Sequence, residues 1–308
     1  MTAATPTPLI LEIKGNSLDD GPGIRSVVFF KGCPLSCVWC HNPESKKPGP
    51  ELAYDPKLCL ACFLCQTICP EQAVSPDYPG FIDRGRCTLC FACAEHCPGG
   101  ALSRVGRAMT AEAVLEKVAA DKPFFDASNG GVTLSGGEPT LFMEYAAGLL
   151  AAFRARQIHT LLETCGFFDF DRFMDLMYPR LDAIYFDLKL FDNAAHRRYC
   201  GVPNEKILTN FEKLVKVTTA DNKPLLPRTP LIPGITDGQD NLKAIAGFLK
   251  GLGVTRAALL AYNPLWHEKT DKIGGPNLLG DDPAMKKFLS AEAVAQCQAI
   301  FYNEGIEV

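Results

Sequence analysis

Residues 26–40 of this chain read SVVFFKGCPLSCVWC, an apolar run that passes directly into three closely spaced cysteines. The run 26–31 has the length and the β-branched and aromatic content of a buried strand. Cys33, Cys37 and Cys40 then follow in a C-x3-C-x2-C pattern, with no fourth cysteine nearby. The stretch therefore predicts a strand whose C-terminal end carries a cysteine-lined site, and the rest of the chain indicates what that site does.

The three cysteines of this first run form an incomplete set of ligands. Three thiolates can hold three corners of a four-iron cluster and leave the fourth iron open for an external ligand, as in a catalytic metal site. A zinc site of three cysteines and His41 is the alternative that the triplet alone leaves open. Other motifs converge on the same edge of the predicted sheet, which favours the open cluster and makes His41 a neighbouring loop residue.

Two further cysteine runs form an internal duplication. Residues 59–70 and 87–98 both read C-x2-C-x2-C-x3-C-P. In bacterial ferredoxins each triplet holds one four-iron cluster, and the fourth cysteine of each run ligates the other cluster. Paired structural zinc sites are the alternative, but zinc ribbons usually separate two C-x2-C hairpins by a longer gap. The spacing therefore predicts two closed clusters, one held by Cys59, Cys62, Cys65 and Cys97 and the other by Cys87, Cys90, Cys93 and Cys69.

Composition and periodicity divide the chain into a cysteine-rich insert and a larger α/β part. From about residue 48 to 106 the sequence consists of short pieces with proline and glycine and has no long periodic segment. Helical and strand patterns alternate from residue 109 onward. We therefore expect a ferredoxin-like domain over 48–106, inserted into an α/β domain formed by 1–47 and 107–308.

The α/β part is predicted to hold six strands separated by helices. The strands are expected at 26–31, 132–134, 160–163, 183–188, 225–231 and 256–261. One helix is expected from a cap at Thr110 to about 121, a second ends at about 156, and a third follows a cap at Asp169 or Asp171. Three more helices are expected over 205–218, 239–252 and 290–303. Such alternation forms parallel sheets with right-handed crossovers, and six repeats are too few for a closed eight-stranded barrel. The predicted fold class is therefore α/β, a partial (β/α)6 barrel of TIM-like type.

Polar and glycine-rich motifs follow the expected strands at their C-terminal ends, where barrel enzymes carry their working residues. They lie at 33–40, 135–139, 163–166, 187–189, 228–234 and 262–264. Six motifs that converge on one edge indicate a functional site rather than a set of scattered turns.

Composition and charge exclude several classes of protein. With 47% hydrophobic and 21% charged residues, the 308-residue chain is typical of a soluble globular protein. A net charge of −4 indicates no basic surface for nucleic acid. We find no apolar run of about 18 residues that would predict a membrane span, and residues 1–8 lack the pattern of a signal peptide. Grouped cysteines favour metal ligation in a reducing compartment, so we expect a cytoplasmic protein without nucleic-acid or membrane partners.

Six short motifs, together with the first cysteine run, carry a resemblance to a known family. They read DGPGIR at 20–25, FKGC at 30–33, CHN at 40–42, GGVTLSGGEP at 130–139, DLK at 187–189 and GVPN at 201–204. The chain resembles the radical S-adenosylmethionine (SAM) superfamily, and within it the glycyl-radical-enzyme activating enzymes of the pyruvate formate-lyase activating enzyme family. The resemblance runs from about residue 13 to 308, and the insert is similar to that of the larger type with a two-cluster ferredoxin-like domain.

The resemblance implies a partial barrel of the radical SAM type and an oxidoreductase activity. In this family the amino and carboxylate groups of SAM bind the open iron of a four-iron cluster, whose ligands here would be Cys33, Cys37 and Cys40. One electron cleaves the sulfonium and yields a 5′-deoxyadenosyl radical, which takes a hydrogen atom from a backbone glycine of a partner glycyl radical enzyme. The cofactors implied are three 4Fe-4S clusters, SAM and a monovalent cation, sodium or potassium.

The resemblance also implies roles for residues outside the cysteine runs. The Gly-Gly-Glu motif would hold the amino end of SAM, an aromatic side chain would lie near its adenine, and two basic side chains would meet its carboxylate and ribose. Two acidic side chains would bind the cation, with backbone oxygens near Thr164 and Tyr185. The residues implied are Trp39, Gly136, Gly137, Glu138, Glu163, Asp187, Lys189, Arg228 and Asn263.

Two of these residues depart from the family pattern, and several have a purely structural alternative. Glu163 stands where the pyruvate formate-lyase type has aspartate, and Asn263 stands where that type has histidine, so any proton-dependent role there would be lost. Trp39 could be a packed aromatic, and Lys189 and Arg228 could form a structural ion pair. The Gly-Gly-Glu motif could be a plain tight turn.

The segment before the first predicted strand would receive the glycine loop of the partner, because a rigid Gly-Pro-Gly bend suits an extended peptide. An ordinary surface turn is the alternative. The residues implied are Asp20, Gly21, Pro22, Gly23 and Arg25. Three cysteines lie outside the runs, and we expect all of them to be buried inert thiols: Cys165, Cys200 and Cys297.

Three functions of different classes explain parts of the sequence. An activating enzyme explains all motifs, whereas a radical SAM enzyme for a small molecule leaves the 20–25 and 187–204 segments without a purpose. A pure electron-transfer module explains only the insert. We expect an activating enzyme that works as a monomer, with a glycyl radical enzyme as protein substrate and a flavodoxin or ferredoxin as electron donor.

Overall fold

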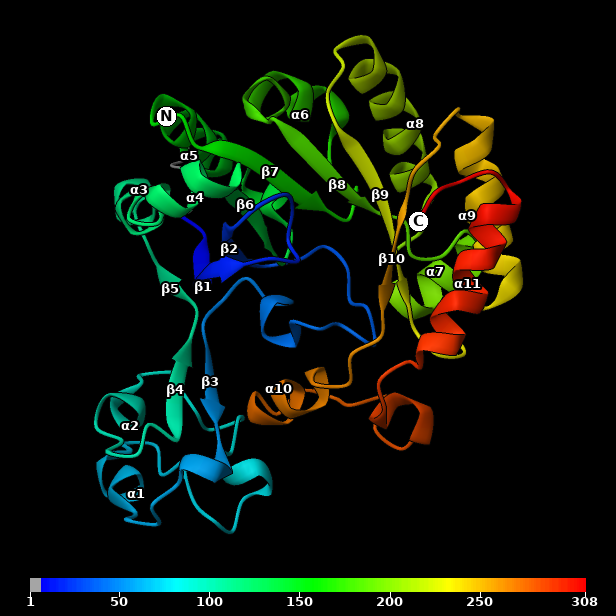
Figure 1. Cartoon of the computed structure of the whole chain (residues 1–308). Helices are drawn as coiled ribbons and strands as arrows, with labels where there is room; N and C mark the ends of the chain where they lie inside the picture. The colour runs from blue at the N-terminus through cyan, green and yellow to red at the C-terminus, as the bar shows by residue number, and fades with distance from the viewer. Residues whose placement is uncertain (1–6) are drawn as a thin grey trace.

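The computed structural model describes residues 7–308, so most of the expectation about residues 1–8 lies outside the described residues. Its main element is an eight-stranded sheet in the order β10-β9-β8-β7-β6-β2-β1-β5 (Figure 1). Six neighbouring strands run parallel, which confirms the six that the sequence predicts. They are β2 (Arg25–Lys31), β6 (Gly131–Gly136), β7 (His159–Thr164), β8 (Ala183–Asp187), β9 (Leu225–Leu231) and β10 (Ala258–Ala261).

Two strands of this sheet are absent from the sequence-based prediction. β1 (Leu9–Ser17) pairs antiparallel with β2, and the short β5 (Arg107–Ala108) pairs antiparallel with β1. The residues of β1 alternate between buried and more exposed positions, so period-two alternation was a signal that could have revealed it. These two strands extend the sheet beyond β2 instead of closing it, so the architecture is an open partial barrel.

Helices follow the parallel strands and cover the outer face of the sheet (Figure 1). Thr110 and Asp169 cap their helices with side-chain oxygens, as the sequence predicts, and Asp169 rather than Asp171 is the cap of α6. Ser290 caps α11 in the same way. The predicted helices are α3 (Ala111–Ala119), α5 (Met143–Ala155), α6 (Phe170–Leu176), α8 (Glu205–Ala220), α9 (Gln239–Gly251) and α11 (Ala291–Asn303). Three short helices of the α/β part were not predicted: α4 (Lys122–Ser128), α7 (Asn193–Cys200) and α10 (Trp266–Lys272).

The cysteine-rich segment has a small sheet and a hydrophobic cluster of its own. β3 (Glu51–Tyr54) pairs antiparallel with β4 (Leu102–Val105), and the two bracket the short helices α1 (Leu64–Ile68) and α2 (Ala92–Glu95). Both halves of the duplication repeat the same unusual backbone, because matched positions have positive φ angles. The matched residues are Ala61 with Leu89 and Phe63 with Phe91.

Ion pairs join this insert to the large sheet. The side chain of Lys31, at the end of β2, is fully buried and lies 2.7 Å from Glu51 at the start of β3. On the other side, Lys272 of α10 pairs with Asp55 at 2.7 Å. The insert is therefore tied both to the strand that precedes the first cysteine run and to α10. No helix within residues 7–308 has the length and apolar character needed to span a membrane.

Candidate active site

A cavity of about 260 Å³ opens at the C-terminal ends of the parallel strands. It brings together residues from β6, β7, β8, β9 and β10 and from the loops that follow β2, β6, β7 and β8, as the convergence of the motifs predicts. The predicted site residues that line it are Asp20, Cys33, Cys37, Trp39, Cys40, Gly136, Gly137, Glu163, Asp187, Lys189 and Arg228. Two predicted contacts, Glu138 and Asn263, do not line it.

The loop that carries the first cysteine run is held from two sides by backbone hydrogen bonds. On one side Cys33 N donates to Lys46 O at 3.1 Å. On the other side Ser36 N and Val38 N, which flank Cys37, donate to Cys200 O at 2.8 Å and to Tyr199 O at 3.0 Å. The last turn of α7, a helix that the sequence did not predict, therefore fixes the middle of the cysteine loop.

Two cysteines outside the runs lie against the first cysteine run. A hydrogen bond with the Cys200 thiol lowers the pKa of Cys37 to about 7, against the effect of burial. Cys165 is hydrogen-bonded to Cys33, and burial together with this contact raises the pKa of Cys165 well above its ordinary value. Cys297 lies elsewhere, with its Sγ 4.0 Å from Asp237 O. All three thiols are buried, and two of them are neighbours of the candidate cluster ligands.

Gly136 and Gly137 let the loop after β6 touch the loop after β2. Gly136 has a φ of +99°, and an added Cβ there would lie 2.5 Å from Phe30 N. A Cβ on Gly137 would lie 2.2 Å from Gly32 O, which already accepts a hydrogen bond from Glu138 N at 2.8 Å. Only glycine permits this approach, so the motif does more than form a tight turn.

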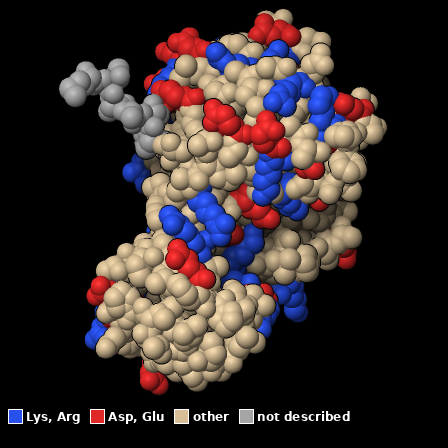
Figure 2. Space-filling model, turned by 90° about the vertical axis from the view of Figure 1, so that its left-hand side faces the viewer, with Lys and Arg blue, Asp and Glu red and all other residues tan. Residues whose placement is uncertain are grey.

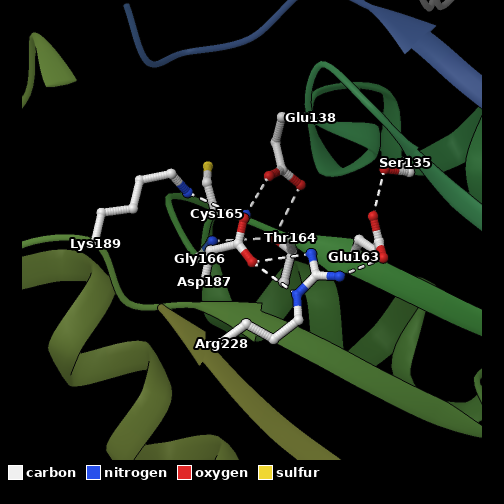
Figure 3. A network of polar contacts seen from close by, with 9 residues as sticks. All are labelled: Ser135, Glu138, Glu163, Thr164, Cys165, Gly166, Asp187, Lys189 and Arg228. Carbon is white, nitrogen blue, oxygen red and sulfur yellow. Dashed lines mark hydrogen bonds and ion pairs between the residues drawn. The ribbon is translucent and has the colours of Figure 1, made fainter. Parts of the chain in front are cut away.

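The side chain of Glu138 is directed at Thr164 and Cys165 at the end of β7 (Figure 3). It is 1% exposed, and its carboxylate accepts hydrogen bonds from Cys165 N at 2.7 Å, Thr164 Oγ1 at 2.9 Å and Thr140 Oγ1 at 2.7 Å. The side chain therefore braces the loop after β6 against the end of β7. The contact of Glu138 with SAM stays a prediction.

Four charged side chains form a closed network at the floor of the cavity (Figure 3). Arg228 lies between the two acids: it pairs with Glu163, and its guanidinium lies 2.9 Å from Asp187 Oδ1. Lys189 Nζ lies 3.1 Å from Asp187 Oδ2. Ser135 Oγ donates to Glu163 at 2.6 Å. The network holds two positive and two negative charges, so each buried charge has a partner of opposite sign.

Burial and pairing set the protonation of these groups. Burial raises the pKa of Glu163 in spite of the Arg228 guanidinium beside it. Burial also acts against ionisation of Asp187, but Arg228 and Lys189 together hold its pKa below the ordinary value. The carboxylates raise the pKa values of Lys189 and Arg228 against the effect of burial, so both remain cations.

Aromatic and apolar side chains close the remaining walls. Trp39 is 3% exposed and packs in one hydrophobic cluster with Tyr262 and Trp266. Burial lowers the pKa of His41 to about 4, so the imidazole beside the cavity is neutral. Asn263 lies outside the cavity because its Oδ1 accepts from Leu265 N at 2.9 Å, and Leu260 lies on the β10 wall instead.

The buried side chain of Arg25 holds the segment 20–25 in place. Arg25 is fully buried, and its guanidinium donates to Thr133 Oγ1 at 2.7 Å, Val132 O at 2.6 Å and Pro22 O at 3.1 Å. Thr133 in turn donates to Asp20 O at 2.7 Å. Pairing of β2 with β6 encloses the Arg25 side chain, so Arg25 supports the segment from inside the protein, and the contact of residues 20–25 with a partner stays a prediction. Asp20 alone of the segment lines the cavity.

The cysteines of the insert come together in the crossed grouping that the duplication predicts. One small cavity has Cys59, Cys62, Cys65 and Cys97 among its lining residues. A second one has Cys69, Cys87, Cys90 and Cys93 among its lining residues. The donor set of each cavity is four thiols, which suits a four-iron cluster.

Comparison with known proteins gives matches over both parts of the chain. The radical SAM superfamily matches residues 84–245, a 4Fe-4S single cluster domain matches 19–68, and a 4Fe-4S dicluster domain matches 51–98. A crystal structure of a radical SAM methyltransferase from Sphaerobacter thermophilus is 13% identical, with a TM-score of 0.53 over 97% of this chain and 76% of that one. This likeness shows the radical SAM fold.

Curated relatives cover most of the chain at higher identity. The isethionate sulfite-lyase activating enzyme of Nitratidesulfovibrio vulgaris is 40% identical, over 85% of this chain and 86% of the relative. The trans-4-hydroxy-L-proline dehydratase activating enzyme of Clostridioides difficile is 38% identical, over 86% and 88%. The chain belongs to the radical SAM family of glycyl-radical-enzyme activating enzymes.

Proposed function

We propose that Cys33, Cys37 and Cys40 hold the open-site 4Fe-4S cluster at which this activating enzyme cleaves SAM. The observation that carries the proposal is that all three thiols of the first cysteine run line the cavity at the ends of six parallel strands, with Cys165 as the other cysteine of its lining. The chemistry of the donors fits, because thiolates are the cysteine form that binds metal and three of them leave one iron of a four-iron cluster open. When bound, the cluster supplies the electron that splits the sulfonium of SAM into methionine and a 5′-deoxyadenosyl radical.

The other cavity residues would bind SAM and exclude water. Backbone groups of Gly136 and Gly137 would meet its amino end, Trp39 would pack near its adenine, and Lys189 and Arg228 would meet its carboxylate. A sodium or potassium ion at Glu163 and Asp187 would require Arg228, which now pairs with both acids, to exchange one of them for the SAM carboxylate. Asp20, on the cavity wall, would contact the glycine loop of a glycyl radical enzyme.

We further propose that residues 48–106 form a domain that carries two more 4Fe-4S clusters, giving three in all. These clusters would relay electrons from a flavodoxin or ferredoxin to the open cluster of a monomeric enzyme. The crossed grouping of eight cysteines around two cavities supports this assignment.

Anaerobic reconstitution with iron and sulfide tests the proposed function. We expect about 12 irons per chain and formation of 5′-deoxyadenosine from SAM after addition of a strong reductant. Addition of a partner glycyl radical enzyme should then produce the electron paramagnetic resonance signal of a glycyl radical. Absence of 5′-deoxyadenosine with any reductant would exclude both the activase and a small-molecule radical SAM enzyme. SAM cleavage without a glycyl radical on any such partner would favour the small-molecule alternative.

The relay is tested by removing one ligand from each insert cluster. We expect Cys62→Ala and Cys90→Ala to lose most of the activity driven by reduced flavodoxin, because the path through the insert is broken. Activity driven by a small diffusible reductant that reaches the open cluster directly should persist. The relay idea fails when both variants keep full activity with the protein donor.

Conservative replacement of Arg25 tests the role of segment 20–25. Lysine keeps the charge but cannot reproduce the several fixed donors of the guanidinium, so the backbone at Pro22 and Asp20 loses its support. We expect Arg25→Lys to lower the rate of glycyl radical formation by about tenfold to a hundredfold. SAM cleavage without partner should change little. Arg107→Lys, at an exposed position of β5, is the control and should match the wild type in both measurements.

A further inference from the structure

The two halves of the insert share one backbone but present different surfaces. Aligning Cys59 with Cys87 brings α1 onto α2, and the positive φ angles fall on matched residues in both halves. Each half is therefore a control for the other. A feature of one half that its counterpart lacks is not required by the shared local fold.

Four large apolar side chains are exposed in the first half only. They are Leu58, Leu60, Phe63 and Leu64, which are 49%, 67%, 45% and 41% exposed, and we call them the tip patch.

Their counterparts in the second half are polar, small or covered. Arg86 takes the place of Leu58, Thr88 that of Leu60 and Ala92 that of Leu64. Phe63 corresponds to Phe91, which is only 6% exposed because it packs in the hydrophobic cluster of the insert, with the Arg104 guanidinium 4.5 Å from its ring centroid. Exposed side chains of this size cost solvation free energy unless a partner covers them, so the tip patch points to an interaction surface.

The position of the tip patch indicates what covers it. Cys62, a candidate cluster ligand, is exposed in the middle of the patch. Figure 1 draws α1 at the end of the insert that lies away from the large sheet, so the patch is remote from the cavity that a glycine loop must reach. A partner seated here would contact the edge of a closed cluster and nothing of the SAM site.

The charge of the surface indicates the kind of partner. Residues 58–70 contain no Asp, Glu, Lys or Arg. In Figure 2 the face of the insert turned to the viewer is mostly uncharged, whereas charged side chains gather where it meets the larger body. An uncharged apolar surface binds a partner by burying apolar area and not by long-range electrostatic attraction. Four side chains form a small surface, which suits the small, short-lived interfaces of electron-transfer proteins.

We propose that the tip patch is the docking surface for a small electron-carrier protein whose cofactor edge lies in an uncharged, apolar surface. Electrons then enter through the cluster of Cys59, Cys62, Cys65 and Cys97. The inference rests on the proposed function of the insert clusters.

The experiment uses Leu64→Glu and its matched control Ala92→Glu. Both place a glutamate at the first residue of a short helix of the insert, and neither residue lines a cysteine cavity. Reduced flavodoxin is the protein donor, dithionite is the diffusible reductant, and formation of 5′-deoxyadenosine is the readout.

We expect Leu64→Glu to raise the KM for flavodoxin about tenfold, the effect of losing one buried leucine contact. Ala92→Glu should leave this KM unchanged. Both variants should keep the wild-type iron content and the wild-type rate with dithionite. The KM of the wild type for flavodoxin should depend only weakly on salt between low and physiological concentration, because the four side chains of the patch are uncharged and Lys57 beside them is paired with Glu268.

Other results would overturn the docking proposal. Equal KM values for Leu64→Glu and the wild type would show that the patch does not bind the donor. A steep salt dependence of the KM for flavodoxin would indicate that the donor binds a charged surface elsewhere. A wild-type dimer that Leu64→Glu converts to a monomer would assign the patch to a second copy of the chain. Loss of glycyl radical formation with dithionite would assign it to the glycyl radical enzyme. Absence of 5′-deoxyadenosine from the wild type with both reductants is a different result, which overturns the proposed function itself.

Discussion

Replacing Cys37 with alanine is expected to abolish SAM cleavage and to lower the iron content from about 12 to about 8 per chain. Cys37 is the middle residue of the first cysteine run and is 7% exposed, and the backbone on both sides of it is held by α7. Two remaining thiolates would not hold the open cluster. The eight insert cysteines line separate cavities, so their clusters should form as in the wild type.

Cys297→Ala is the matched control for this variant. Cys297 is also 7% exposed, but it lies near Asp237 and far from every predicted ligand set. It should keep the full iron content and full cleavage of SAM, measured by iron analysis and by chromatography of 5′-deoxyadenosine. Cleavage by Cys37→Ala at the wild-type rate would rule out the assignment of the open cluster to the first cysteine run.

Replacing Arg228 with alanine is expected to have the second-largest effect. Arg228 is the only side chain among the described residues that pairs with both Glu163 and Asp187, and all three are largely buried. Its removal leaves two buried carboxylates with one cation, Lys189, which costs about 3–5 kcal/mol. We expect a fall of roughly 10 °C in the unfolding midpoint and loss of measurable SAM binding. Calorimetry measures both quantities.

The pH dependence of this variant follows from the buried acid that loses its partner. Burial already raises the pKa of Glu163 above its value in the unfolded chain, and loss of Arg228 raises it further. A carboxyl group with a raised pKa in the folded protein stabilises the folded state at pH values below its pKa in the unfolded chain. This stabilisation is lost as the pH rises through its pKa in the folded protein. The destabilisation of Arg228→Ala relative to the wild type should therefore increase from acidic to neutral pH.

Two further variants test whether the effect of Arg228→Ala comes from the lost charge, from the lost geometry or from removing any arginine. Arg228→Lys keeps the charge but cannot bridge two carboxylates, so its midpoint should lie between those of the wild type and Arg228→Ala. Arg256→Ala removes an exposed arginine whose pair with Glu307 is solvent-screened, and it should cost less than about 1 kcal/mol. Equal midpoints for Arg228→Ala and Arg256→Ala would contradict the structural importance of the buried network.

Much of the architecture could be predicted because its signals are local in the sequence. The six parallel strands are short apolar runs followed by glycine or polar residues, and Thr110, Asp169 and Ser290 cap helices through their own side chains. The crossed grouping of the insert cysteines follows from a repeated spacing. α7 and α10 were missed because they are short and partly polar, and tertiary contacts support them more than their own periodicity does.

The sequence by itself determined the family, the six parallel strands and the cysteine runs, because each depends on residues a few positions apart. Only the tertiary structure decided where particular side chains point. Arg25 is enclosed by contacts with Thr133, and Glu138 is turned inward by the amide of Cys165. Arg228 lies between acids from two other strands. The physical reason is that a buried polar group must find its partner wherever the fold brings one, and these partners are far apart in the sequence.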